Sequence, residues 1–188
     1  SKARLKTYVK KELKQIKDEF GDERCSEIIE HSESKAFSQE EILSAEPVTV
    51  VLSQAGWIRS AKGHDINPET LAFRGDDALK HFANGRNNQM ANFFDSTGKV
   101  FSISAHTLPS ARGMGEPITG RISAESGVSF QGVIIGTDDQ TFVISNTSGY
   151  GFISEISNVV STKKTGKNFI KIPYEADLIP PILIKDHH

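Results

Sequence analysis

The alternation of apolar and polar positions forms one unit that occurs three times along the chain. In each unit a short apolar run leads into a glycine turn, a second apolar run follows, and a loop with its own glycine comes last. The copies span residues 48–63, 90–115 and 133–167, and their turn glycines are Gly56, Gly98 and Gly149. Steps of 42 and 51 residues between these glycines are typical of propeller-type blades built from short strands. Because one such unit cannot bury its own apolar face, we expect the copies to pack on each other with their loops aligned along one edge.

A helical period occupies the start of the chain. Apolar residues at steps of three and four form one stripe, made of Leu5, Val9, Leu13, Ile16 and Phe20. The pattern predicts a helix over residues 3–20 that Gly21 caps, with the stripe packed on a neighbouring helix. We therefore expect a helical segment at 1–29, a linker at 30–46 and a β domain at 47–188, with Pro47 marking the start of the β domain.

Composition and charge narrow the class of protein. The chain has 188 residues, of which 37% are hydrophobic and 24% charged, and this balance is typical of globular proteins. No apolar run approaches the roughly 20 residues of a membrane span. The single cysteine, Cys25, excludes a disulfide within the chain and fits a reducing cytoplasm. Since the net charge is −2, any binding to nucleic acid has to come from where the basic residues lie rather than from bulk charge.

Basic residues gather in the loops and strand ends of the units. Arg74–Gly75, Arg112–Gly113 and Thr165–Gly166 are expected to hold matching positions after the second strand of each unit. Lysine and arginine neutralise phosphates, and glycine lets a backbone approach them closely, so repeated basic loops favour a phosphate-binding surface over ordinary solvated loops. The candidate binding residues are Arg59, Lys62, His64, Arg74, Arg86, Arg112, Lys163, Lys164 and Lys167.

The other conspicuous residues predict structure rather than chemistry. Trp57, Phe101 and Tyr150 follow the turn glycines, where an aromatic ring more often fills a blade core than stacks on a base. The histidines lack the spacing of metal ligands, and the chain has neither a P-loop nor a nucleophile–base pair. We therefore assign no catalytic residue and no metal site.

Four stretches of the chain carry a family resemblance. "EPVTVVLSQAGWIRSAKGHDI" at 46–66, "DSTGKVFSISAHTLPSARGMGEPITGRI" at 95–122 and "DDQTFVISNTSGYGFI" at 138–153 resemble the first three blades of the C-terminal domain in the A subunit of bacterial DNA topoisomerase IV. "LKQIKDEFGDER" at 13–24 resembles the end of the helical tower that precedes this domain in the A subunits of type IIA topoisomerases. The resemblance covers nearly the whole chain.

The resemblance implies a mainly β fold: a propeller-like β-pinwheel of about three blades that exchange strands, preceded by an N-terminal α-helix. It also implies a DNA-binding and DNA-bending domain of a cytoplasmic, nucleoid-associated enzyme that decatenates and relaxes DNA. The implied partners are duplex DNA, the topoisomerase IV B subunit and a second A subunit, with no membrane. In this family the catalytic tyrosine and the sites for ATP and magnesium lie elsewhere, so we expect no cofactor and no catalysis by this chain alone.

Two alternatives stay open. The C-terminal DNA-wrapping domain of the gyrase A subunit is the nearest one, although that domain carries a Gln-Arg-Arg-Gly-Gly-Lys-Gly box that this chain lacks. A non-catalytic propeller that docks proteins is the other, since propeller edges can pair with a further strand. Salt separates DNA binding from strand docking, because only contacts to phosphate weaken steeply as salt rises.

Overall fold

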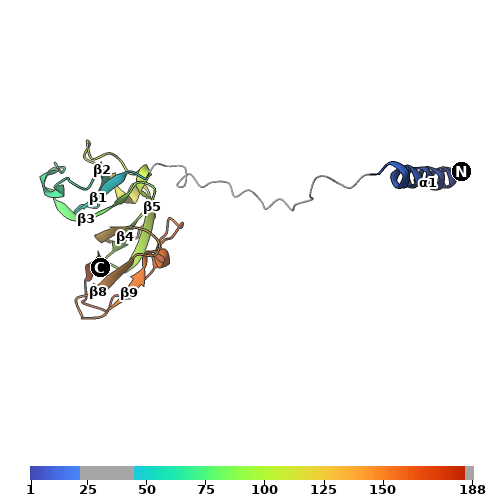
Figure 1. Cartoon of the computed structure of the whole chain (residues 1–188). Coiled ribbons are helices and arrows are strands. Elements are labelled where there is room, and N and C mark those ends of the chain that lie inside the picture. The colour runs from blue at the N-terminus through green and yellow to red at the C-terminus, as the bar shows by residue number, and fades with distance from the viewer. Residues whose placement is uncertain (22–44, 185–188) are drawn as a thin grey trace. The chain divides into compact units, whose positions relative to one another are not determined.

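The computed structural model describes residues 1–21 and 45–184, as a helix and a separate β domain (Figure 1). Helix α1 runs over Lys2–Phe20 and confirms the predicted helix. The apolar stripe is exposed, from Leu5 to Phe20, so its packing on a neighbouring helix stays a prediction. Gly21 ends the helix with φ −75°, and its N–H bonds to Lys17 O. A Cβ there would lie 2.2 Å from that oxygen, so glycine serves close approach rather than a left-handed cap.

Cys25, most of the expected linker at 30–46 and the last residues of the chain lie outside the described residues. Within the described part, no helix combines the length and apolar content needed to cross a membrane.

The β domain consists of three antiparallel sheets (Figure 1). Its strands are β1 (Pro47–Ser53), β2 (Trp57–Lys62), β3 (Leu79–Arg86), β4 (Met90–Asp95), β5 (Lys99–Ser104), β6 (Glu116–Pro117), β7 (Phe130–Ile135), β8 (Thr141–Asn146), β9 (Gly151–Glu155), β10 (Lys167–Asn168) and β11 (Leu178–Leu183). The sheet orders are β3-β1-β2-β6, β7-β4-β5-β10 and β11-β8-β9. β6 therefore follows the second unit in sequence but completes the first sheet, and β10 completes the second sheet in the same way. This arrangement confirms three blades with strand exchange.

The hairpin turns repeat the same chemistry in all three blades. Each turn glycine has a positive φ, which is 77° at Gly56, 84° at Gly98 and 83° at Gly149. Three residues earlier a side-chain oxygen accepts backbone N–H groups of the turn. The acceptors are Ser53 Oγ, Asp95 Oδ1 and Asn146 Oδ1, at 2.9–3.3 Å. The predicted turns are confirmed, and they close each hairpin because glycine tolerates the left-handed backbone.

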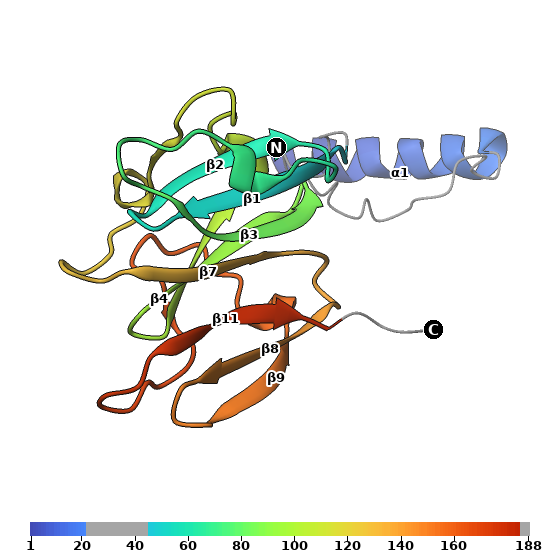
Figure 2. The same cartoon turned by 90° about the vertical axis from the view of Figure 1, so that its left-hand side faces the viewer.

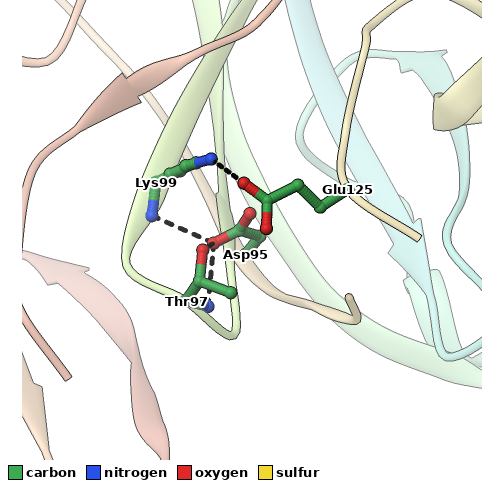
Figure 3. Close-up of polar contacts among 4 residues, drawn as sticks. All are labelled: Asp95, Thr97, Lys99 and Glu125. Carbon is green, nitrogen blue, oxygen red and sulfur yellow. Dashed lines mark hydrogen bonds and ion pairs between the residues drawn. The ribbon is translucent and has the colours of Figure 1, made fainter. Parts of the chain in front are cut away.

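The second turn also holds a cluster of charged groups (Figure 3). Buried Asp95 Oδ1 accepts from the backbone N–H and the hydroxyl of Thr97 and from the backbone N–H of Lys99. The Lys99 ammonium forms an ion pair with Glu125 in the loop before β7. This contact raises the pKa of Lys99 and lowers that of Glu125. The cluster ties the turn to the loop between β6 and β7.

The loop glycines correct one expected match between repeats. Gly115 and Gly166 directly precede the exchanged strands β6 and β10, with φ of 86° and 72°, whereas Gly113 does not have a positive φ. A Cβ at Gly115 would lie 2.6 Å from Ile58 O, and one at Gly166 would lie 2.9 Å from Val100 O. Gly115 thus matches Gly166, and Arg112 matches Lys163. The expected match of Arg112–Gly113 with Thr165–Gly166 is wrong, because the glycine before the exchanged strand sets the register.

The core lies between successive sheets. One cluster joins the first two sheets, and the other joins the second and third. Phe101 and Phe130 pack edge to face at 5.9 Å in the first cluster, and Phe94 and Phe142 lie 6.0 Å apart in the second. Phe101 is buried as expected and Trp57 is half-buried, but Tyr150 is 69% exposed, so the expected core role is wrong for Tyr150.

Strands β3, β7 and β11 contact one another in sequence along one side of the domain (Figure 2). At the first of these seams the backbone N–H of Val133 on β7 donates to His81 Nδ1 on β3, at 3.3 Å. Burial lowers the pKa of His81, because the charged form of the ring loses hydration there. The exchanged strands β6 and β10 lie at the opposite edge of their sheets, which we call the outer edge.

Candidate nucleic-acid interface

Two equivalent loops follow the outer edge, at residues 109–115 and 160–166; we call them the first and second exchange loops. The first lies along β2, where Ser60 N donates to Pro109 O at 2.8 Å and Ala111 N donates to Ser60 O at 2.9 Å. The second lies along β5, where Ser161 N donates to Ser102 Oγ at 2.9 Å. Because Ser60 and Ser102 hold the same place in their strands, the two loops leave their blades at the same point.

A serine in each exchange loop positions the basic residue two places later. Arg112 N donates to Ser110 Oγ at 3.3 Å, and Lys163 N donates to Ser161 Oγ at 3.4 Å. Such turns hold the backbone locally and leave the following side chain free. Arg112 and Lys163 are both exposed at the outer edge. Lys164 and Lys167 are exposed beside Lys163, and Lys167 Nζ donates to Asn158 O at 2.7 Å.

Arg59 differs from the other candidate residues because it is 3% exposed. Its Nη1 donates to Gly113 O at 3.0 Å, and its guanidinium lies 4.6 Å from the ring centre of Phe73. Burial lowers the pKa of Arg59, and Asp77 partly offsets this effect. Its position therefore suits anchoring the first exchange loop rather than contact with an external phosphate, and we leave Arg59 out of the proposed contact surface.

Three candidates come together around the start of β1. Lys62 and Gly85 both pair with Val48, from opposite sides of β1. His64 Nε2 lies 2.9 Å from Gly85 O, and the neighbouring Arg86 reaches Ala45 O through Nη1 at 3.2 Å. All three candidate side chains are exposed, although Lys62 forms an ion pair with Glu46 at 3.3 Å.

Arg74 lies apart from that group. Its guanidinium covers the ring of Trp57 at 5.3 Å, on the loop that precedes β3. A cation over an indole face keeps its charge while its position is restrained. Gly75 has a φ of 60° and no neighbour within 4 Å of a Cβ, so this loop is not packed as the exchange loops are.

Arg121 is a residue that sequence reasoning missed. It forms an ion pair with Glu116 of β6, and its guanidinium donates to Thr107 Oγ1 at 2.9 Å and to Thr107 O at 2.6 Å. These bonds fix a half-buried cation beside the second exchange loop. The only sequence signal was a basic residue shortly after a charged exchanged strand, and nothing in the repeat pattern singles it out. Among the described residues, no group of acidic, histidine or cysteine side chains could hold a metal ion.

Comparison with known proteins shows which family the chain belongs to. It is 43% identical to the A subunit of DNA topoisomerase 4 from Pseudomonas aeruginosa, over 99% of this chain and 25% of that protein. The structure matches the C-terminal domain of Escherichia coli ParC with a TM-score of 0.69 and 42% identity, over 76% of this chain and 58% of that one. The chain belongs to the family of DNA topoisomerase IV A subunits. The expected relationship and the expected β-pinwheel fold are confirmed.

Further comparisons set the limits of this assignment. The C-terminal domain of DNA gyrase A aligns with a TM-score of 0.54 at 15% identity, over 74% of this chain and 48% of that one, so the likeness shows a shared fold alone. No protein-family model matches the chain. The chain spans about a quarter of the length of the curated topoisomerase relative that it matches.

Proposed function

We propose that the β domain binds duplex DNA along its outer edge and bends it, as the C-terminal domain of a topoisomerase IV A subunit. The observation that carries the proposal is the repeat of one basic loop on successive blades: Arg112 and Lys163 occupy the same place, each two residues after the serine that holds its loop. A row of cations on a rigid edge suits a phosphate backbone, and phosphate contacts position a duplex without reading its sequence.

The parent enzyme is proposed to be an ATP-dependent type IIA topoisomerase that decatenates and relaxes DNA. This protein would act with a second A subunit and with the B subunit, in the bacterial cytoplasm at the nucleoid. Membership in the family of topoisomerase IV A subunits supports this assignment, because the relatives that share it are topoisomerase subunits. The nucleophile, ATP and magnesium would belong to other parts of that enzyme, so this chain by itself would neither cleave nor relax DNA.

A protein-docking role is the second candidate, and one observation favours it. β9 is the last strand of its sheet among the described residues, and Phe152 and Ile153 on it are exposed. An unpaired strand edge can accept a strand from another chain. Docking of this kind would depend little on salt, in contrast to phosphate binding.

The test is an electrophoretic gel-shift titration of the whole chain on linear duplex at several salt concentrations. If about four cations engage phosphates at once, log affinity falls against log salt with a slope of about −3.6. Replacing Lys163, Lys164 and Lys167 together by Ala should weaken binding on all sequences alike and flatten the slope, with no loss of stability. A matched control replaces Lys6, Lys10 and Lys14 of α1 by Ala, which removes the same charge from residues that are not part of the β domain. A triple variant that binds like the control variant, or loses affinity on one sequence only, would contradict the proposal.

A further inference from the structure

A contact between the hairpin turn and the loop that leads to β3 or β7 occurs in both of the first two blades. In the first blade Trp57 follows the turn glycine, and the guanidinium of Arg74 lies 5.3 Å from the centre of its ring. In the second blade Lys99 follows the turn glycine and forms an ion pair with Glu125 (Figure 3). In each case the residue after the turn glycine contacts a side chain of the loop, and the chemistry of the pair differs between blades.

The third blade keeps the backbone arrangement that brings turn and loop together. Thr147, two residues before the turn glycine, donates its N–H to Asp177 O at 2.9 Å, and Asp177 N donates to Thr147 Oγ1 at 2.9 Å. Gln54, two residues before the first turn glycine, makes the same backbone bond to Ala78 O, also at 2.9 Å. The turn between β8 and β9 therefore lies beside the loop before β11 as the first turn lies beside the loop before β3.

Exposed tyrosines occupy both positions of this contact in the third blade. Tyr150 follows the turn glycine, as Trp57 does, and is 69% exposed. Tyr174 directly precedes a residue with a positive φ, as Arg74 does, and is 93% exposed. The third blade thus has a tyrosine where the first blade has the cation that covers the aromatic ring.

A carboxylate lies next to the two tyrosines. Glu175 directly follows Tyr174 and is exposed. Its φ is 64°, and among the described residues it is the only non-glycine residue with a positive φ. The loops before β3 and β7 have Gly75 and Gly127 as their positive-φ residues, and glycine adopts this backbone without strain. The third blade therefore carries a carboxylate beside its aromatic rings in spite of a strained backbone.

We propose that Tyr150, Tyr174 and Glu175 form a docking site for an arginine side chain of a partner protein. The first blade indicates what this position accepts, because a guanidinium covers the aromatic residue after its turn glycine. A planar guanidinium stacks on aromatic rings and pairs with a carboxylate at the same time. The negative charge of Glu175 disfavours the phosphates of a nucleic acid, so the fitting partner is a protein with an exposed arginine in a basic segment. The inference does not rest on the proposed DNA binding.

The test uses aromatic side chains of the whole chain as NMR reporters. The chain has three tyrosines and one tryptophan, and Tyr8 belongs to α1 rather than to the β domain. Titration with the peptide acetyl-Gly-Arg-Gly-amide should shift the ring signals of Tyr150 and Tyr174 together. The signals of Tyr8 and Trp57 should stay in place, since Arg74 already covers Trp57. The corresponding lysine peptide should bind severalfold more weakly, because an ammonium lacks the planar face that stacks on a ring.

Exchanging residues between the first and third blades sharpens the test. Tyr174→Arg places an arginine of the chain itself beside Tyr150, as Arg74 lies beside Trp57, so the response of Tyr150 to the peptide should be lost. Arg74→Ala uncovers Trp57, whose indole signal should then begin to respond to the peptide. A Tyr174→Arg variant that binds the peptide as well as the parent does would overturn the arginine site.

The carboxylate is tested by a matched pair of variants. Glu175→Gln removes the charge and should weaken peptide binding severalfold, whereas Glu69→Gln removes an exposed carboxylate of the first blade and should bind as the parent does. Thermal melting checks that all variants are folded. Equal tyrosine shifts with acetyl-Gly-Gly-Gly-amide, or tyrosine shifts with oligothymidylate and none with the arginine peptide, would overturn the proposal. Since these titrations contain no duplex, a failure of DNA binding would contradict the proposed function and leave the arginine site standing.

Discussion

The first and second exchange loops share a backbone and differ in charge. Both begin at a serine-held turn, both end at a positive-φ glycine packed on the neighbouring strand, and both feed a two-residue exchanged strand. Yet Glu116 opens β6 where Lys167 opens β10, and the second loop adds Lys164. The serine of the turn and the positive-φ glycine therefore fix the backbone conformation of the loop. The charge at the remaining positions can then differ from blade to blade without changing this backbone conformation.

The two loops also rest on different supports. Beneath the first is Arg59, and the residue at the same place in the second blade is Phe101, which lies 2.7 Å from where a Cβ on Gly166 would stand. A buried guanidinium needs hydrogen bonds to offset its lost hydration, whereas a phenyl ring needs only packing. The side chain beneath the first loop therefore supports it through a directional bond, and the side chain beneath the second supports it through packing.

The largest expected effect concerns the turn glycines that hold the ends of the exchanged segments. Gly56 O accepts from Ile118 N, and Gly98 O accepts from Phe169 N. A Cβ at Gly98 would lie 1.9 Å from Ile170 O, whereas one at Gly56 has no atom closer than 3.7 Å. Gly98→Ala should therefore cost about 3 kcal/mol of unfolding free energy and Gly56→Ala about 1 kcal/mol, since both strain the backbone but only the first clashes. Urea unfolding measures both, and equal losses would show that the two blades do not differ there.

The next largest effect is expected at Arg59, which supports the first exchange loop. Arg59→Ala should lower the free energy of unfolding by about 2 kcal/mol, because Gly113 O loses its donor and a cavity opens beside Phe73. Arg59→Phe copies the second blade and should recover part of this loss through packing. Denaturant titration of both variants decides the matter, and a Phe variant no better than the Ala variant would show that the supports cannot be exchanged.

The seam between the first two blades should respond to pH. His81 has a lowered pKa in the folded chain, so below about pH 6.5 the unfolded chain binds a proton that the folded chain resists. The contribution of His81 to stability is thus full above that pH and falls as the pH drops, by about 1.4 kcal/mol per unit of pKa shift. His81→Gln should flatten this part of the profile, and His106→Gln, at an exposed site, serves as the control. A profile that keeps its slope in His81→Gln would assign the titration to another group.

The smallest effect is expected from exchanging the charges of Glu116 on β6 and Lys167 on β10. Glu116→Lys gives the first exchanged strand the charge of the second, and it should raise DNA affinity a fewfold at low salt and steepen the salt slope. It also frees Arg121 from its ion pair, which contributes little to stability because both side chains are partly exposed. Lys167→Glu is the reverse exchange and should weaken binding. Filter-binding titrations that move both variants in the same direction would contradict a contact role for this position.

Much of the fold could be predicted from the sequence, because its helix and hairpin turns depend on residues close together in the chain. The turn glycines, the first strand at Pro47 and the helix predicted over residues 3–20 each follow from a period or from one special residue. The exchanged strands are two residues long and carry no period, so only the family resemblance indicated them. The predicted match between the loops was wrong because Arg112–Gly113 has the same pattern as a basic residue next to a positive-φ glycine. The glycine that precedes the exchanged strand with a positive φ is Gly115.

The candidate site was harder to predict for the same physical reason. Arg59 alternates with Ile58 on a strand, but both faces of that strand are covered, so alternation could not show that the arginine is inside. Arg121 gains its place from contacts with Glu116 and Thr107 that only the folded chain creates. Lys163 and Lys164 were easier to recognise, since a run of lysines without acids stands out in any loop.

Strand exchange also sets the order in which the sheets can be completed during synthesis on the ribosome. The first sheet receives β6 only after the whole second hairpin has been made, and the second sheet receives β10 only after the third hairpin. Each of the first two blades is thus made with an uncovered strand edge, which a strand more than fifty residues further along the chain later covers. A chain that ended before β6 or β10 would leave that edge exposed, and an exposed strand edge can pair with a strand of another chain.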